Sequence, residues 1–260
     1  MKKIATLSLF LLCNLIFSQD FIEPEKQGTQ MEINELNTLI EKHPSSENYY
    51  YRGYFNYQNN NFFDALLDYD KAIQLSPNDF KTYYSRGILK IKTTDFKGAI
   101  EDFSQCILIN NTSYKSYFNI AFAKTKINDF EGAIKDYNNC IKLNPSYFPA
   151  YQNRGMLYKS QNLFQKAISD FDKVIELDTN NLEAYQERAV SKAMLNQKEA
   201  VADFDKVISI APQNAQAYYN RALYFINFKI KRDYCSDLTQ ALKLGFTPAK
   251  DVIAEVCSKK

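Results

Sequence analysis

The sequence has no tryptophan, one histidine, seven glycines and seven prolines among its 260 residues. Glycine-rich phosphate-binding loops and histidine-based metal sites need residues that are scarce here. The histidine, His43, is followed by Pro44, and no serine, cysteine or carboxylate has a local catalytic signature. We therefore expect no cofactor, no metal and no enzymatic activity, with a catalytic pair assembled only by the fold as the open alternative.

An excess of charge is also missing. There are 32 basic and 30 acidic residues, and Lys2 and Lys3 lie in an N-terminal segment that has no acidic residue before Asp20. Without that segment the two signs balance. A neutral chain has no net field to attract nucleic acid or an anionic membrane, so nucleic acid is not expected as a partner. The 45% apolar and 24% charged content is that of a folded, soluble chain.

The N-terminus has the pattern of a secretory signal peptide. Two lysines precede an apolar stretch from Ile4 to Phe17, and Ser18 and Gln19 follow. The stretch is shorter than the roughly 20 residues that cross a bilayer. We expect residues 1–19 to be removed, residues 20–30 to form a flexible lead-in, and the mature chain to be periplasmic or secreted without a membrane span. A retained N-terminal anchor is the alternative.

A repeat of about 34 residues dominates the remaining chain. The blocks are residues 46–79, 80–113, 114–147, 148–181, 182–214 and 215–247. The fourth residue of every block is a tyrosine: Tyr49, Tyr83, Tyr117, Tyr151, Tyr185 and Tyr218. Five blocks then have alanine at a second shared position: Ala65, Ala99, Ala133, Ala167 and Ala200. The sixth block keeps the tyrosine but is degraded further on.

Each block predicts two amphipathic helices. In the first block, Tyr49 and Gly53 mark one helical stripe, and Ala65 and Tyr69 mark another. Polar residues at 58–61 separate the stripes with a turn. An isolated helix pair cannot bury both faces, whereas stacked pairs share a continuous core.

This pattern resembles the tetratricopeptide repeat family over residues 46–247. The resemblance implies an all-α, right-handed superhelical solenoid of about six helix-turn-helix units. We expect capping helices at residues 31–45 and 248–260. Bulky Tyr234 stands where the other blocks have alanine, so the sixth unit should be atypical.

Two charged ladders run through the blocks. Five blocks share an arginine: Arg52, Arg86, Arg154, Arg188 and Arg221. All six have an aspartate further along: Asp68, Asp102, Asp136, Asp170, Asp203 and Asp237. A catalytic carboxylate is needed once, so we interpret the ladders as structural ion pairs within or between units. Ile120 replaces the arginine in the third block, where we expect Asp136 to use solvent, a neighbouring arginine or a backbone donor, and the local structure to be irregular.

The first helices of the pairs are expected to form a concave groove that binds a peptide or partner helix. The predicted partner-groove residues are Tyr50, Tyr54, Tyr57, Tyr84, Ile88, Phe118, Phe122, Met156 and Tyr219. If they are exposed, replacing Tyr54, Tyr84 and Phe122 with alanine abolishes capture and preserves helicity. The alternative is that several of these rings pack between successive first helices.

One group of tetratricopeptide repeat proteins binds the C-terminal carboxylate of chaperones through a clamp of lysine and asparagine residues on its first helices. Only Lys115 fits that clamp in charge, so chaperone binding is not predicted. The preferred function is an exported, non-enzymatic protein-interaction scaffold whose partner is unidentified. The alternatives are a self-assembly module and an accessory subunit of an envelope enzyme or secretion complex.

The cysteines predict one disulfide. Cys106 and Cys140 occupy equivalent places in adjacent blocks, too far apart to bridge, and are expected to be free and buried. Cys235 and Cys257 are equidistant from a turn centred on Phe246. In an antiparallel helical hairpin such residues lie at the same height, and an exported protein reaches an oxidising compartment, so a bond between them is expected.

Overall fold

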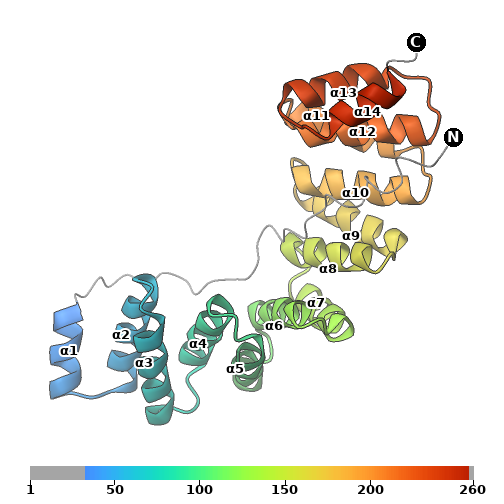
Figure 1. The fold of residues 1–260 in the computed structure, drawn as a ribbon. Coiled ribbons are helices and arrows are strands. Elements are labelled where there is room, and N and C mark those ends of the chain that lie inside the picture. Colours follow the sequence, from blue (N-terminus) through green and yellow to red (C-terminus); the bar gives the residue numbers. More distant parts are fainter. Residues whose placement is uncertain (1–32, 258–260) are drawn as a thin grey trace. The chain divides into compact units, whose positions relative to one another are not determined.

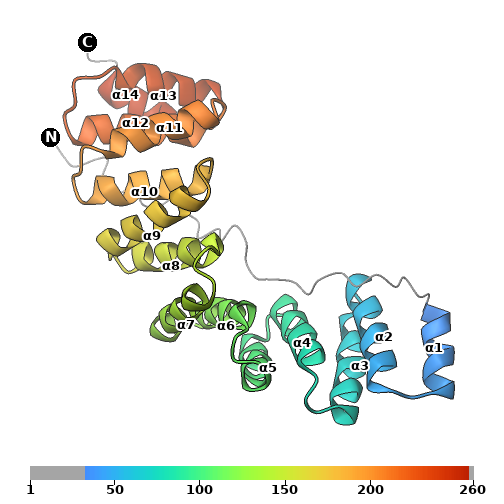
Figure 2. The same cartoon turned by 180° about the vertical axis from the view of Figure 1, so that it is seen from behind.

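The structure is a computed structural model that describes residues 33–257, and within this range it contains helices and no strands. They are α1 (Ile33–Lys42), α2 (Ser46–Gln58), α3 (Phe62–Leu75), α4 (Phe80–Lys92), α5 (Phe96–Ile109), α6 (Tyr114–Lys126), α7 (Phe130–Leu143), α8 (Phe148–Ser160), α9 (Phe164–Leu177), α10 (Leu182–Met194), α11 (Ala200–Ile210), α12 (Ala215–Asn227), α13 (Tyr234–Lys243) and α14 (Ala249–Val256). Figures 1 and 2 show them from opposite sides. The predicted signal peptide, the lead-in and the first residues of the N-terminal capping helix lie outside the described residues.

The helices follow the repeat found in the sequence. The six even-numbered helices from α2 to α12, here called the first helices, begin at the first residue of their blocks: Ser46, Phe80, Tyr114, Phe148, Leu182 and Ala215. The six odd-numbered helices from α3 to α13 are called the second helices. An all-α repeat fold is therefore confirmed for the described residues, with α1 preceding the first pair and α14 following the last.

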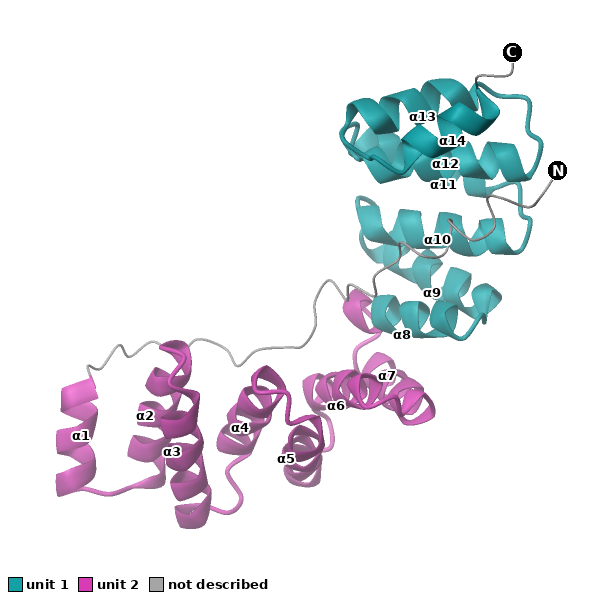
Figure 3. Ribbon diagram, in the orientation of Figure 1, with its two compact units in different colours: residues 1–18, 151–260 teal, residues 19–150 magenta. Residues whose placement is uncertain are grey.

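The chain divides into two compact units. Of the described residues, 33–150 form the N-terminal unit and 151–257 form the C-terminal unit (Figure 3). The core of the N-terminal unit contains Tyr50, Tyr69, Ile88 and Phe103. Each unit is thus a stack of helix pairs with aromatic rings at its centre.

The turn within each pair needs a left-handed backbone residue. This residue has a φ of 62° at Asn60 and 63° at Thr94, and the same place is asparagine in the next three pairs. Asparagine tolerates positive φ better than most residues. In the second and third pairs an aspartate then caps the second helix, because Asp95 accepts a hydrogen bond from the Gly98 amide and Asp129 from that of Gly132.

Close helix approach explains the small residues of the repeat. A Cβ atom on Gly53 would lie 2.9 Å from Cδ1 of Tyr69, and one on Gly87 would lie 2.8 Å from Cζ of Phe103. The rings of the second helices therefore pack directly over the backbone of the first helices, as the small-residue pattern predicts.

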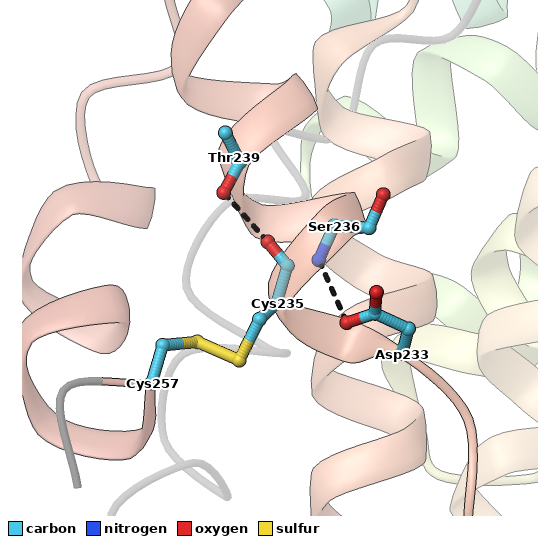
Figure 4. The surroundings of a disulfide bond; sticks show 5 residues. All are labelled: Asp233, Cys235, Ser236, Thr239 and Cys257. Atoms are coloured by element: carbon cyan, nitrogen blue, oxygen red, sulfur yellow. Dashed lines mark hydrogen bonds between the residues drawn. A yellow bond between two sulfur atoms is a disulfide. The ribbon is translucent and has the colours of Figure 1, made fainter. Parts of the chain in front are cut away.

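The C-terminal end departs from the repeat and carries the disulfide. Helix α13 begins only at Tyr234, where Asp233 caps it by accepting from the Ser236 amide. A turn through Gly245, whose φ is +93°, leads to α14. Cys235 and Cys257 are joined with their Cα atoms 5.9 Å apart, as the hairpin geometry predicts (Figure 4). Cys106 and Cys140 are free and buried, also as expected.

Alkylation of the unreduced chain lacking residues 1–19 should label two of its four cysteines after denaturation, and peptide mapping should identify these as Cys106 and Cys140. In the native protein both should react slowly, because burial raises the pKa of Cys140 to about 12 and that of Cys106 further, and the thiolate is the reactive form. Replacing Cys235 and Cys257 with serine should cost about 3 kcal/mol through loss of the loop constraint. Four labelled cysteines would contradict the bond.

Candidate functional site

The arginine ladder is a set of bidentate ion pairs inside the helix pairs. In each of five pairs the arginine Nη2 lies 2.5 to 2.7 Å from Oδ1 of an aspartate on the second helix. These pairs are Arg52–Asp68, Arg86–Asp102, Arg154–Asp170, Arg188–Asp203 and Arg221–Asp237. The Nε of each arginine donates to the same carboxylate. The carboxylates are buried, so they serve packing and do not face a substrate.

Three of these arginines also connect successive pairs. Nη1 of Arg86 lies 2.6 Å from Oδ1 of Asp70 on the preceding second helix, and Arg188 and Arg221 make the equivalent contacts to Asp172 and Asp205. At the N-terminal end, Nη1 of Arg52 donates to Oδ1 of Asn37 in α1. The ladder therefore links helices both within and between pairs.

The third block replaces its missing arginine with a lysine. Asp136 lies 2.7 Å from Nζ of Lys124, one helical turn beyond Ile120 on α6. The expected donors were solvent, a neighbouring arginine or a backbone group, and this lysine on the same helix was missed. The expected irregularity is also wrong, because α6 and α7 have the same lengths as α4 and α5. Burial raises the pKa of Asp136, and Lys124 opposes this shift.

The predicted partner-groove residues are core residues. All nine are at most 8% exposed: Tyr50, Tyr54, Tyr57, Tyr84, Ile88, Phe118, Phe122, Met156 and Tyr219. The expectation that they form an open wall is wrong, and the alternative of packing between neighbouring helices holds. Part of the reason is that these rings also contact the second helix of their own pair: Tyr50 lies against Tyr69, Tyr84 against Phe103 and Phe118 against Tyr137.

Contacts between first helices show this packing. The hydroxyls of Tyr50 in α2 and Ser85 in α4 share a hydrogen bond of 3.3 Å. One pair further on, Nδ2 of Asn119 in α6 donates to the Tyr84 hydroxyl over 3.0 Å. In both cases a polar residue on one first helix meets a tyrosine on the preceding one. Burial raises the pKa of Tyr50 to about 12, in keeping with a ring inside the stack.

Lysines lie over buried or partly buried rings in the N-terminal unit. Nζ of Lys81 lies 3.9 Å from the ring centre of Tyr50 and 4.7 Å from that of Tyr51. Nζ of Lys126 lies 4.8 Å from the ring centre of Phe122. Burial lowers the pKa of Lys81. The outer layer of these first helices is therefore cationic, with aromatic rings directly beneath it.

The first helices of the C-terminal unit make polar contacts instead. Nε2 of Gln152 in α8 donates to Oε2 of Glu183 in α10 over 2.6 Å, and Lys159 forms an ion pair with Glu187.

Among residues 33–257, no three histidine, cysteine, aspartate or glutamate side chains are grouped so that they could hold a metal ion. None of the helices in this part of the chain is both long and apolar enough to span a membrane.

Models of the tetratricopeptide repeat match residues 46–79, 114–147 and 148–181. The chain contains tetratricopeptide repeats. These matches coincide with the first, third and fourth helix pairs, so the resemblance seen in the sequence is confirmed there. A search of the curated proteins finds no match.

Solved repeat proteins share the fold. MamA has 25% identity and a TM-score of 0.62, covering 66% of this chain and 94% of its own. YrrB, described as having an unusual peptide-binding site, has 22% identity and a TM-score of 0.62, covering 72% of this chain and 97% of its own. The C-terminal part of a repeat protein from Cytophaga hutchinsonii has 22% identity and a TM-score of 0.74, covering 84% and 92%.

Replacing Tyr54, Tyr84 and Phe122 together with alanine should unfold the N-terminal unit, because truncating a buried aromatic ring costs about 3–5 kcal/mol. Thermal melts followed by far-ultraviolet circular dichroism measure this. A matched control replaces three exposed apolar residues on second helices: Phe63, Leu67 and Leu108, which are 73%, 52% and 77% exposed. Full helicity in the first variant would return these rings to a binding role.

Replacing Lys124 with methionine should lower the free energy of unfolding by about 3 kcal/mol at pH 7, because Asp136 stays charged and buried without its cation. The loss should shrink on acidification. Without Lys124 the pKa of folded Asp136 rises further above the unfolded value of about 3.9, so the folded state takes up the proton first and gains stability as the pH falls.

Urea unfolding at pH 7 and pH 5 measures this effect. Adding Asp136→Asn to the Lys124→Met variant removes the buried charge, and should restore most of the loss and abolish its pH dependence. A loss that is equal at both pH values, with no rescue by the second change, would assign Lys124 a packing role only.

Proposed function

We propose that the protein is an exported, non-enzymatic scaffold that holds a partner protein on its first-helix surface. Tetratricopeptide repeats are protein-interaction modules, and no enzyme family is indicated. The observation that carries the proposal is the surface of the N-terminal unit, where Lys81 and Lys126 lie over the rings of Tyr50 and Phe122. The lysines give this surface positive charge, whereas the rings beneath them belong to the core.

Export is supported by the signal-peptide pattern of residues 1–19 and by the cysteines. A disulfide between Cys235 and Cys257 persists in an oxidising compartment and is uncommon in a reducing cytosol. We therefore assign the mature chain to the periplasm or the extracellular space.

Self-assembly is a second candidate, and one observation favours it. Phe63 and Leu67 lie one turn apart on α3 and are 73% and 52% exposed. The second block has Lys97 and Glu101 at the equivalent places. An exposed apolar pair of this kind could contact another copy of the chain through the second-helix surface.

The two surfaces can be separated by photo-cross-linking in cells. A photoreactive residue is placed at Lys92 or Lys126, at the ends of the first helices α4 and α6, and for comparison at Lys97 or Lys135 on the second helices α5 and α7. We expect heterologous cross-links from the first two positions only, made by a chain whose mass shows cleavage near Ser18 and Gln19.

Cross-links only from Lys97 and Lys135 would place the binding surface on the second helices and contradict the proposed first-helix surface. Products made of two copies of this chain, formed from a photoreactive residue at Phe63, would favour self-assembly. A full-length chain found in the cytosol would remove the export part of the proposal.

A further inference from the structure

The C-terminal unit contains a cavity of about 750 Å³ where the chain departs from the repeat. The turn inside a helix pair is residues 59–61 in the first pair, but residues 228–233 in the sixth. Residues 229–233 of this longer turn line the cavity, together with Ile226 of α12, Tyr234 of α13 and Val256 of α14. The longer turn and the helix that follows the last pair therefore build the cavity between them.

One part of the lining is apolar, and its residues are only partly buried: Ile226, Ile230, Tyr234 and Val256. All four also pack against the core of the C-terminal unit. Val256 precedes Cys257, whose bond to Cys235 ties the end of α14 to the start of α13 (Figure 4). The disulfide therefore holds the α14 part of this wall beside the rest.

The other part of the lining is cationic, and its side chains are exposed: Lys229, Lys231 and Arg232. Within residues 33–257, neither of these lysines forms an ion pair. Arg232 lies 3.7 Å from Oδ2 of Asp205, and the Oδ1 atom of the same carboxylate pairs with Arg221. One carboxylate thus serves two guanidinium groups.

The acidic residue of the lining, Asp233, has a structural role. Its Oδ1 atom accepts a hydrogen bond of 3.1 Å from the Ser236 amide and so caps α13 (Figure 4). With three cations and this one anion, the lining has a net positive charge.

Lys229 is an unusual choice at its place in the turn. Its φ is 51°, and the equivalent left-handed residue is asparagine in four of the five other pairs. Asparagine tolerates this conformation better than lysine does. The sixth pair therefore has a cation at the cavity where the repeat favours a neutral turn residue.

These two parts of the lining set the chemistry of a ligand. A cavity of this volume is in the range that holds a small molecule. Its partly buried apolar side chains favour a carbon chain or ring, and its unpaired lysines favour an anionic group close to that chain. A neutral apolar molecule would leave the cations unused, and a purely polar anion would leave the apolar wall unused.

We propose that this cavity binds a small amphipathic acid, with its apolar part against Ile226, Ile230 and Val256 and its carboxylate at Lys229 and Lys231. The inference goes beyond the proposed scaffold function and does not depend on it. The cavity lies wholly in the C-terminal unit, whereas the proposed partner surface lies in the N-terminal unit.

Nuclear magnetic resonance titration of the ¹⁵N-labelled chain lacking residues 1–19 tests the proposal. The probes are octanoate and octan-1-ol, which have the same chain length and differ in charge. We expect octanoate to bind saturably, to shift the amide signals of residues 225–234 and of Val256, and to bind at least about fivefold more tightly than octan-1-ol.

Matched lysine variants test the charged part of the site. Lys229→Gln with Lys231→Gln should weaken octanoate binding by about fivefold or more and leave octan-1-ol binding unchanged. The control, Lys243→Gln with Lys250→Gln, changes exposed lysines of α13 and α14 that lie outside the lining, and should change octanoate binding by less than about twofold. Both double variants remove the same charge, so a difference between them is a local effect.

A steric variant tests the cavity itself. Val256→Trp puts a large ring into the space and should abolish binding of both probes without changing the charge. Circular dichroism melts verify that this variant is folded, and alkylation followed by mass measurement verifies that its disulfide is formed.

Absence of saturable octanoate binding, equal affinity for the two probes, or equal weakening by the two lysine double variants overturns the inference. Unchanged binding by folded Val256→Trp also overturns it. Association with phosphatidylglycerol vesicles that needs Lys229 and Lys231, without binding of octanoate, overturns it in favour of an anionic membrane surface. Each of these failures leaves the cross-links expected from Lys92 and Lys126 unaffected, so the scaffold function is judged separately.

Discussion

The bidentate pair between an arginine on the first helix and a buried aspartate on the second is the interaction on which the rest of the structure depends. An aspartate buried in a helix interface destabilises the fold unless a cation neutralises it, and the planar guanidinium can satisfy both carboxylate oxygens at once. Its third nitrogen remains available to the preceding pair, as Arg86 shows with Asp70. One side chain thus fixes the spacing inside a pair and the register between pairs, and the rings are positioned as a consequence.

The third pair shows how far this constraint can be relaxed. Ile120 fills the arginine position with apolar volume, and Lys124 reaches the carboxylate from one turn away. Lys90 and Lys192 occupy the same place in pairs that keep their arginines. The repeat therefore contains a second cation position that can replace the first, which explains why α6 and α7 remain regular.

The sequence predicted the fold almost completely, because the repeat places each helix start, small residue and charge partner several times over. It also predicted the disulfide, since hairpin geometry relates Cys235 to Cys257 directly. The binding surface was harder to predict from the sequence. Helical spacing separates the side of the first helix that carries Tyr54 and Tyr84 from the side that carries the small residues, but it does not show that the folded chain buries both sides.

The disulfide makes the two ends of the repeat array differ in stability. A stack of helix pairs in contact only with its neighbours frays from its ends, where one side of a helix has no neighbour. At the C-terminal end, the bond from Cys235 to Cys257 ties α14 to α13, so this end cannot separate one helix at a time. At the other end, α1 is held by the buried residues Leu36 and Ile40 and by the contact of Asn37 with Arg52. Unfolding should therefore start at α1. Under a pulling force or in the presence of a protease, α1 should separate from the stack more easily than α14.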